Sequence, residues 1–150
     1  MLIHDIASID DVYASRLPGN PQTNHSMMMT VRLVKQLVFG CAVVVVGGLS
    51  LLPQEVLPET GVWDKLEHVV AYAALCVTGA IAYPRKLARS KLLLGLVLYG
   101  VALEALQSFV PGRVASIADV TANTLGVVVG FMAVQTVKTA AIWMRNCSAK

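Results

Sequence analysis

The sequence predicts an all-α integral membrane protein: a bundle of four transmembrane helices that follows a flexible polar N-terminal tail, with both termini cytoplasmic. Composition is the first reason. Of the 150 residues, 56% are hydrophobic and only 14% are charged, and the mean hydropathy is +0.66. Soluble domains carry nearer a quarter charged residues, so the composition disfavours a soluble globular enzyme. The net charge of +3 is too small to indicate a nucleic-acid-binding protein.

The second reason is that the apolar residues fall into four blocks. Each block is close to the roughly 20 residues that a helix needs to cross a bilayer, and each of the first three stops at a proline, which ends a helix. We expect a tail over residues 1–32, with a true start near its three methionines as an alternative, and a transmembrane domain over residues 33–145. The helices are predicted at about 33–52, 63–83, 92–110 and 117–137.

The third reason is an unequal division of charge between the two ends of these blocks. The basic residues at one end are Arg32, Lys35, Arg85, Lys86, Arg89, Lys91, Lys138, Arg145 and Lys150. Only Lys65 and Arg113 fall at the other end. Because positively charged loops stay in the cytoplasm, we expect a multi-pass protein of the bacterial inner membrane with its N- and C-termini inside.

Three helices carry polar residues near their predicted outer ends, spaced by one turn so that each set shares a helix face. The sets are Asp64, His68 and Tyr72; Glu104 and Gln107; and Asp119 and Asn123. Gly126 and Gly130 continue the last set with a G-x-x-x-G spacing that permits close helix packing. Ionisable groups inside a span are costly unless they pair or face a cavity. We therefore expect the three sets to meet, with Arg113 as the principal counter-charge.

Capping of helix ends is an alternative for some of these residues. Asp64 can complement the dipole of its own helix, and Ser116 with Asp119 resembles a capping box. Glu104 lies near the C-terminal end of its helix, where a carboxylate is unfavourable, so capping does not explain it. His68 can equally be a structural histidine. A metal site at these residues has little support from their spacing, and we expect no metal and no cofactor.

In their order along the chain, these residues resemble the VanZ-like family of small bacterial membrane proteins, which is named for a teicoplanin-resistance protein. The resemblance covers about residues 52–135. Its parts are Asp64-Lys65-Leu66-Glu67-His68 with Tyr72; Glu104-Ala105-Leu106-Gln107 followed by Pro111-Gly112-Arg113; and Ser116-Ile117-Ala118-Asp119 with Asn123, Gly126 and Gly130. It implies a multi-span inner-membrane protein of the cell envelope and a link to glycopeptide susceptibility. It implies no particular reaction.

The leading hypothesis is a site at the outer membrane face that binds or processes an anionic cell-envelope component, such as a lipid-linked phosphate or a peptidoglycan precursor. Lys65, Arg113 and protonated His68 would hold the anion. Hydroxyl or amide groups of the ligand would be held by Glu104, Gln107, Asp119 and Asn123. The complete candidate site also includes Asp64, Tyr72 and Ser116.

The alternative is a non-enzymatic structural or partner-binding membrane protein, in which the polar residues form an internal ion-pair network. An ion carrier is less well supported, because the other halves of the helices are apolar. If the protein is an enzyme, Glu104 and Asp119 are the candidate acid and base, but no serine or cysteine nucleophile has a suitable partner. The expected partners are membrane lipids and the anionic envelope component. Nucleic acid is not expected, and the oligomeric state is left open.

Overall fold

The structure is a computed structural model that describes residues 21–53 and 62–148. This part of the chain is all-helical and contains no strand. The helices are α2 (Pro21–Ser50), α3 (Val62–Ala82), α4 (Lys86–Gln107) and α5 (Ile117–Ser148). All four are long and apolar enough to cross a membrane, which confirms the predicted class of an all-α protein with four membrane-spanning helices.

The first helix begins earlier than the sequence analysis predicted. Residues 21–32 were assigned to a flexible tail, but α2 starts at Pro21. Proline is favourable in the first turn of a helix, because its missing N–H would have no partner there. Residues 22–32, which include the three methionines, contain neither glycine nor a further proline, so no helix-breaking residue interrupts this part of the helix. The prediction was wrong because it read polarity as disorder; the remainder of the predicted tail, residues 1–20, lies outside the described residues.

The bounds of two other helices also differ from the prediction. α4 spans Lys86–Gln107 rather than 92–110, because lysine and arginine are good helix formers and the basic stretch joins the helix. α5 continues to Ser148, well past residue 137. The connection between these two helices turns at Gly112, whose φ of 78° lies in the left-handed region that favours glycine.

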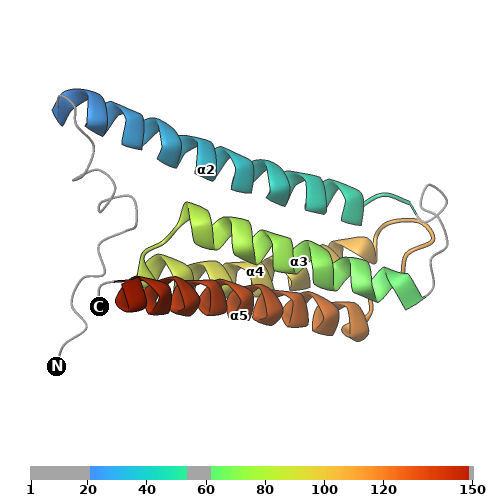
Figure 1. Ribbon diagram of the computed structural model, residues 1–150. Coiled ribbons are helices and arrows are strands. Elements are labelled where there is room, and N and C mark those ends of the chain that lie inside the picture. Colours follow the sequence, from blue (N-terminus) through green and yellow to red (C-terminus); the bar gives the residue numbers. More distant parts are fainter. Residues whose placement is uncertain (1–20, 54–61, 149–150) are drawn as a thin grey trace.

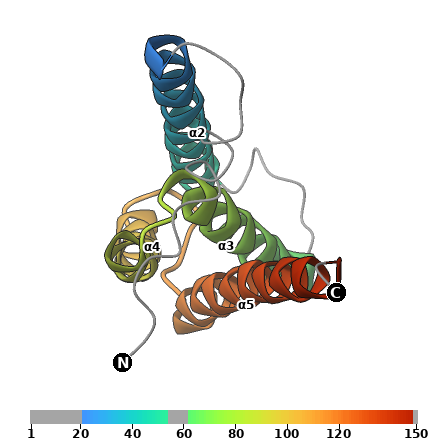
Figure 2. The same ribbon diagram turned by 60° about the vertical axis from the view of Figure 1, so that its left-hand side comes forward.

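The helices run alternately up and down, with α3 at the centre (Figures 1 and 2). α3 packs against each of the other three helices, whereas α2 and α5 do not contact each other. α2 is peripheral, since only 6% of its apolar span is buried, against 28–33% for the other three spans. It diverges from the bundle toward its N-terminus (Figure 1).

This arrangement gives the bundle two chemically different ends. At the first, α2 begins, α3 connects to α4, and α5 finishes; it holds the basic residues of the described chain other than Lys65 and Arg113 and is called the basic end below. At the second, called the polar end, α3 and α5 begin and α2 and α4 finish. The core between the two ends is formed by Tyr72, Leu75, Cys76, Leu96 and Val127.

The tightest helix contact joins α5 to α3 through two glycines. A Cβ added at Gly126 would overlap the carbonyl oxygen of Val69, and one added at Gly130 would lie 2.6 Å from the carbonyl oxygen of Ala73. Both obstacles are backbone atoms of α3, which cannot move aside as a flexible side chain can. Gly126 and Gly130, which the sequence analysis expected to permit close helix packing, therefore lie directly against the backbone of α3.

We expect Gly130→Ala to lower the thermal stability of the purified protein and its amount in the membrane, because the added methyl group pushes α5 away from α3. Overpacking of this kind costs about 1–3 kcal/mol. Gly95→Ala is the matched control, since nothing lies within 4 Å of a Cβ added there. Equal melting temperatures for the two variants would contradict the packing described.

Candidate functional site

The candidate site lies at the polar end, where three helices bring ionisable and amide side chains together. Glu104, Gln107 and Asn123 are each buried, with exposed fractions of 3–4%. Burial of a polar group is costly unless it is hydrogen-bonded. The partners of these side chains therefore show how the site is built.

Glu104 joins the end of α4 to the start of α5. Its Oε1 accepts a hydrogen bond of 2.5 Å from the backbone N–H of Ser116, the residue just before α5 begins. The carboxylate is unfavourable at the C-terminus of its own helix but favourable at the N-terminus of another, where free N–H groups carry partial positive charge. In the predicted capping box, Asp119 would reach this N–H; the structure gives it to Glu104 instead.

His68 and Asn123 form the link between α3 and α5. The distance from His68 Nδ1 to Asn123 Oδ1 is 3.0 Å. Because an amide oxygen only accepts hydrogen bonds, Nδ1 carries the proton, and Nε2 is the nitrogen outside this bond. Gly100 of α4 closes the same region: a Cβ there would lie 3.2 Å from both Asn123 Nδ2 and the hydroxyl of Tyr72. The predicted polar faces of α3 and α5 thus meet.

Lys65 and Asp119 form the more exposed part of the site. Lys65 Nζ lies 3.8 Å from Asp119 Oδ1, and the two side chains are 57% and 14% exposed. Such a long pair with an exposed lysine contributes little to stability. Its lysine is therefore a cation that a ligand could recruit at small cost.

The side chains of Arg113 and Gln107 hydrogen-bond to backbone carbonyl groups at the end of α2. Gln107 Nε2 donates to the carbonyl oxygen of Ser50 at 2.7 Å, and Arg113 Nε donates to the carbonyl oxygen of Leu52 at 3.3 Å. Carbonyl groups at a helix C-terminus lack intrahelical partners, which explains both bonds. We expected Arg113 to be the counter-charge of the buried acids. Among the described residues, no carboxylate is within ion-pair distance of it.

Three buried oxygen atoms at this end have no hydrogen-bond partner among the described residues. They are the hydroxyl of Tyr72, Oε2 of Glu104 and Oδ1 of Asp119. Buried polar atoms without partners are uncommon in folded proteins, so these are positions where a ligand hydroxyl, amide or bridging water would be stabilised. The side chain of Asp64 lies outside the described part of the chain, and its predicted role stays a prediction.

Sequence reasoning missed Tyr99, which attaches the middle of α2 to α4. Its hydroxyl donates to the carbonyl oxygen of Val43 at 2.7 Å. Gly47 makes room for it, since a Cβ there would overlap the same hydroxyl. A lone tyrosine in the apolar middle of a predicted span is the signal that could have drawn attention to it.

The geometry defines a multi-pass helical membrane protein with a partly unsatisfied polar cluster at one end. A family model described as VanZ/LLP1 matches residues 12–138. The chain therefore belongs to the VanZ-like family, as the ordered polar residues predicted. The match includes α2, for which the sequence analysis found no motif. No curated protein and no solved structure matches the chain.

Two substitutions at Glu104 test separately whether the hydrogen-bond acceptor or the negative charge of this side chain stabilises the protein. Glu104→Ala should destabilise the protein by about 1–3 kcal/mol, because it leaves the partly buried N–H of Ser116 without a partner. Glu104→Gln keeps an acceptor oxygen and should melt close to wild type. Thermal unfolding in detergent measures both. If the glutamine variant is as unstable as the alanine variant, the negative charge itself holds α4 to α5.

Proposed function

We propose that this VanZ-like protein binds an anionic component of the cell envelope through the polar end, at the outer face of the inner membrane. The observation that carries the proposal is that the hydroxyl of Tyr72 and Oε2 of Glu104 are buried without a hydrogen-bond partner among the described residues. They lie at the end of the bundle that also carries two cations, Lys65 and Arg113. An ionisable group inside a membrane span normally pairs or faces a functional cavity. Here the pairing is incomplete, which is what a binding site requires before its ligand arrives.

The chemistry of the side chains indicates the kind of ligand. Arg113 bonds to the carbonyl oxygen of Leu52 through Nε, and the terminal nitrogens of a guanidinium can hold a phosphate or carboxylate bidentately. Lys65 adds a flexible positive charge. The oxygens of Tyr72 and Glu104 suit hydroxyl or amide groups. A lipid-linked phosphate or a peptidoglycan precursor presents both kinds of group, and binding such a precursor would connect the protein to glycopeptide susceptibility.

A structural role is the second candidate, and specific contacts favour it. The bonds from Glu104 to Ser116 and from His68 to Asn123 join α3, α4 and α5 without any ligand. If these bonds are the whole purpose of the cluster, substitutions there will unfold the protein. A binding role instead predicts stable proteins that have lost their ligand.

The direct test is native mass spectrometry of the purified protein with a polyprenyl phosphate as the probe. Wild type should retain the lipid, and the double variant Lys65→Gln/Arg113→Gln should bind it at least about tenfold more weakly. The matched control is Lys91→Gln/Arg145→Gln, which removes two exposed positive charges from α4 and α5 outside the site.

Two results would contradict the binding role. Equal affinities in all three proteins would mean that the polar end is not the site. No retention by a wild-type protein that melts cooperatively would favour the structural candidate. Thermal unfolding of the double variant shows whether it is as stable as wild type, so that weaker binding is not mistaken for loss of folded protein.

Maleimide labelling of two cysteine thiols tests the proposed orientation of the protein in the membrane. Cys147 is exposed near the end of α5, and Ser108 is exposed where α4 ends at the polar end. With the termini inside, a membrane-impermeant maleimide should label Cys147 only after the cells are permeabilised. A Ser108→Cys variant, made with the native cysteines replaced, should react in intact cells. The opposite pattern would place the polar end in the cytoplasm.

A further inference from the structure

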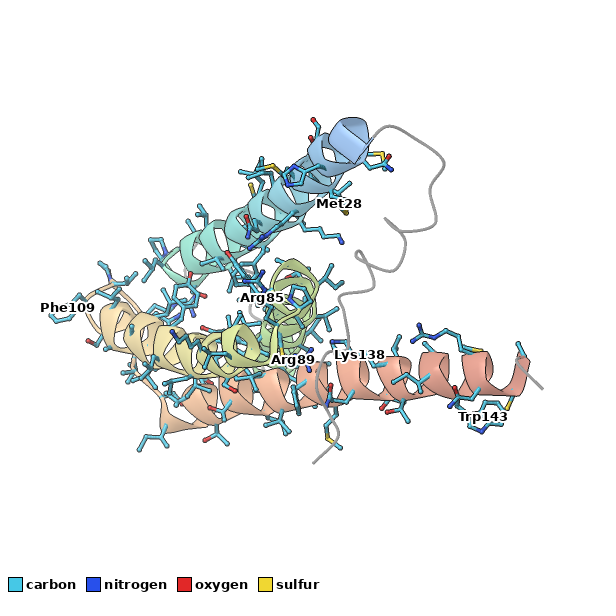
Figure 3. The ribbon with its side chains drawn as sticks, turned by 90° about the vertical axis from the view of Figure 1, so that its left-hand side faces the viewer. Met28, Arg85, Arg89, Phe109, Lys138 and Trp143 are labelled. Carbon is cyan, nitrogen blue, oxygen red and sulfur yellow. The ribbon has the colours of Figure 1, made fainter. Side chains whose placement is uncertain are left out.

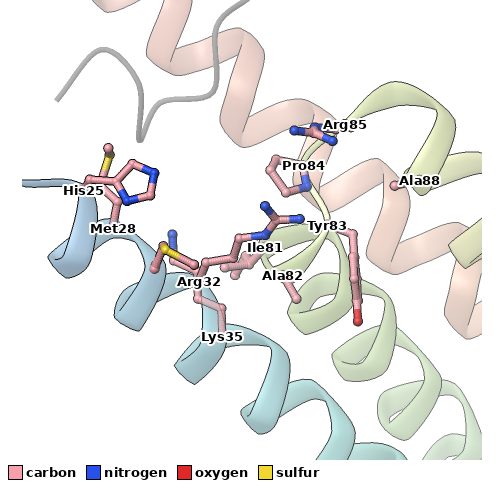
Figure 4. A pocket seen from close by; sticks show the side chains of 11 residues that line it. His25, Met28, Arg32, Lys35, Ile81, Ala82, Tyr83, Pro84, Arg85 and Ala88 are labelled. Carbon is pink, nitrogen blue, oxygen red and sulfur yellow. The ribbon is translucent and has the colours of Figure 1, made fainter. Parts of the chain in front are cut away.

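A second candidate binding site lies at the basic end, remote from the polar cluster. A cavity of about 410 Å³ separates the first part of α2 from the α3–α4 connection. Met28, Met29 and Arg32 line it from α2, and Ile81, Tyr83 and Arg85 line it from the other side. Figure 4 shows Arg32 extending from α2 toward the connection that carries Arg85. The divergence of α2 from the bundle leaves this space (Figure 1).

The charge of the cavity is positive and is not neutralised by the described residues. Arg32 and Arg85 line it from opposite walls. No carboxylate of the described chain is paired with either, because the described acidic residues all lie toward the polar end. The neighbouring Arg89 is different: its guanidinium bonds internally to Gln135 Oε1 at 3.3 Å and to the carbonyl oxygen of Pro84 at 3.1 Å. In Figure 3, Arg85 and Arg89 lie on this side of the bundle with Lys138 of α5.

The remaining lining is apolar and continues into a lipid-facing surface. Met28, Met29 and Ile81 lie in the wall of the cavity. Further along α2, Leu33 and Leu37 are 57% and 67% exposed, as expected for side chains that contact acyl chains. A ligand that fits this arrangement has an anionic head near the guanidinium groups and an apolar body that continues along α2.

We propose that this cavity binds the phosphodiester headgroup of an anionic phospholipid, held between Arg32 and Arg85. The planar guanidinium groups match phosphate oxygens, and basic pockets between membrane helices are typical sites for lipid headgroups. The lipid would fill the space that α2 leaves open and join α2 to the α3–α4 connection. Because the site lies at the opposite end of the bundle, it does not depend on the function proposed for the polar end.

The test is lipid retention by the full-length protein in an uncharged detergent, measured by native mass spectrometry. Phosphatidylglycerol is the anionic probe, and phosphatidylcholine with the same acyl chains is the zwitterionic control. Wild type should prefer phosphatidylglycerol, and Arg32→Gln/Arg85→Gln should weaken its binding by about tenfold or more. Lys91→Gln/Arg145→Gln, which removes two exposed charges outside the cavity, should bind like wild type. Inorganic phosphate, which lacks acyl chains, should not displace the lipid at equal concentration.

Each other result overturns the proposal. Unchanged binding in Arg32→Gln/Arg85→Gln would show that the cavity does not hold the lipid. An equal loss in Lys91→Gln/Arg145→Gln would show attraction to the net charge of this end and no specific site. Displacement by equimolar inorganic phosphate would show a site for a free anion. Thermal unfolding without added lipid confirms that both double variants are folded, and the Lys65→Gln/Arg113→Gln variant should retain phosphatidylglycerol.

Discussion

The close approach of α5 to the backbone of α3 is the contact on which the rest of the structure depends. Lipid is as apolar as leucine, so hydrophobic burial does not drive two helices together inside a membrane; small residues that admit close packing do. Gly126 and Gly130 place α5 directly against the backbone carbonyl groups of α3. This contact fixes the register of the two helices. Asn123, one turn before Gly126, is then held opposite His68, and the start of α5 is held beside Glu104.

From this contact follows the difference between the two ends of the bundle. At the polar end, side chains from α4 and from the α4–α5 connection hydrogen-bond to the end of α2. Some of the buried oxygen atoms there accept no hydrogen bond from the described residues. At the basic end, a cavity opens between α2 and the α3–α4 connection. Exposed aromatic side chains mark both ends: Phe109 follows α4 and is 84% exposed, and Trp143, 68% exposed, lies near the end of α5 (Figure 3). Aromatic side chains are typical of membrane interfaces, so an exposed aromatic side chain at each end is consistent with a bundle that spans the membrane.

Much of this was predictable because the signals are local. Four apolar blocks predicted four helices, and the G-x-x-x-G spacing predicted the close contact of Gly126 and Gly130. The position of Glu104 near the end of its helix indicated a partner outside that helix. The partner itself, a backbone N–H at Ser116, was not predictable, because every residue except proline carries the same group. The bond from Arg113 to Leu52 was missed for the same reason: a carbonyl left unpaired by a helix end has no signature in the sequence. The early start of α2 was missed because polar residues are compatible with a helix as well as with a tail.

The most direct test of this account is a measurement of the contact between His68 and Asn123 in a lipid bilayer. Solid-state NMR on protein with labelled histidine and asparagine can detect transfer between the imidazole nitrogen and the side-chain amide. The account predicts strong transfer, consistent with the 3.0 Å hydrogen bond, and its loss in a His68→Gln control; the control is needed because Asn24 and His25 are adjacent in the chain. A signal that is unchanged in the control, or no signal in wild type, would contradict the register of α3 and α5 and with it the polar end as described.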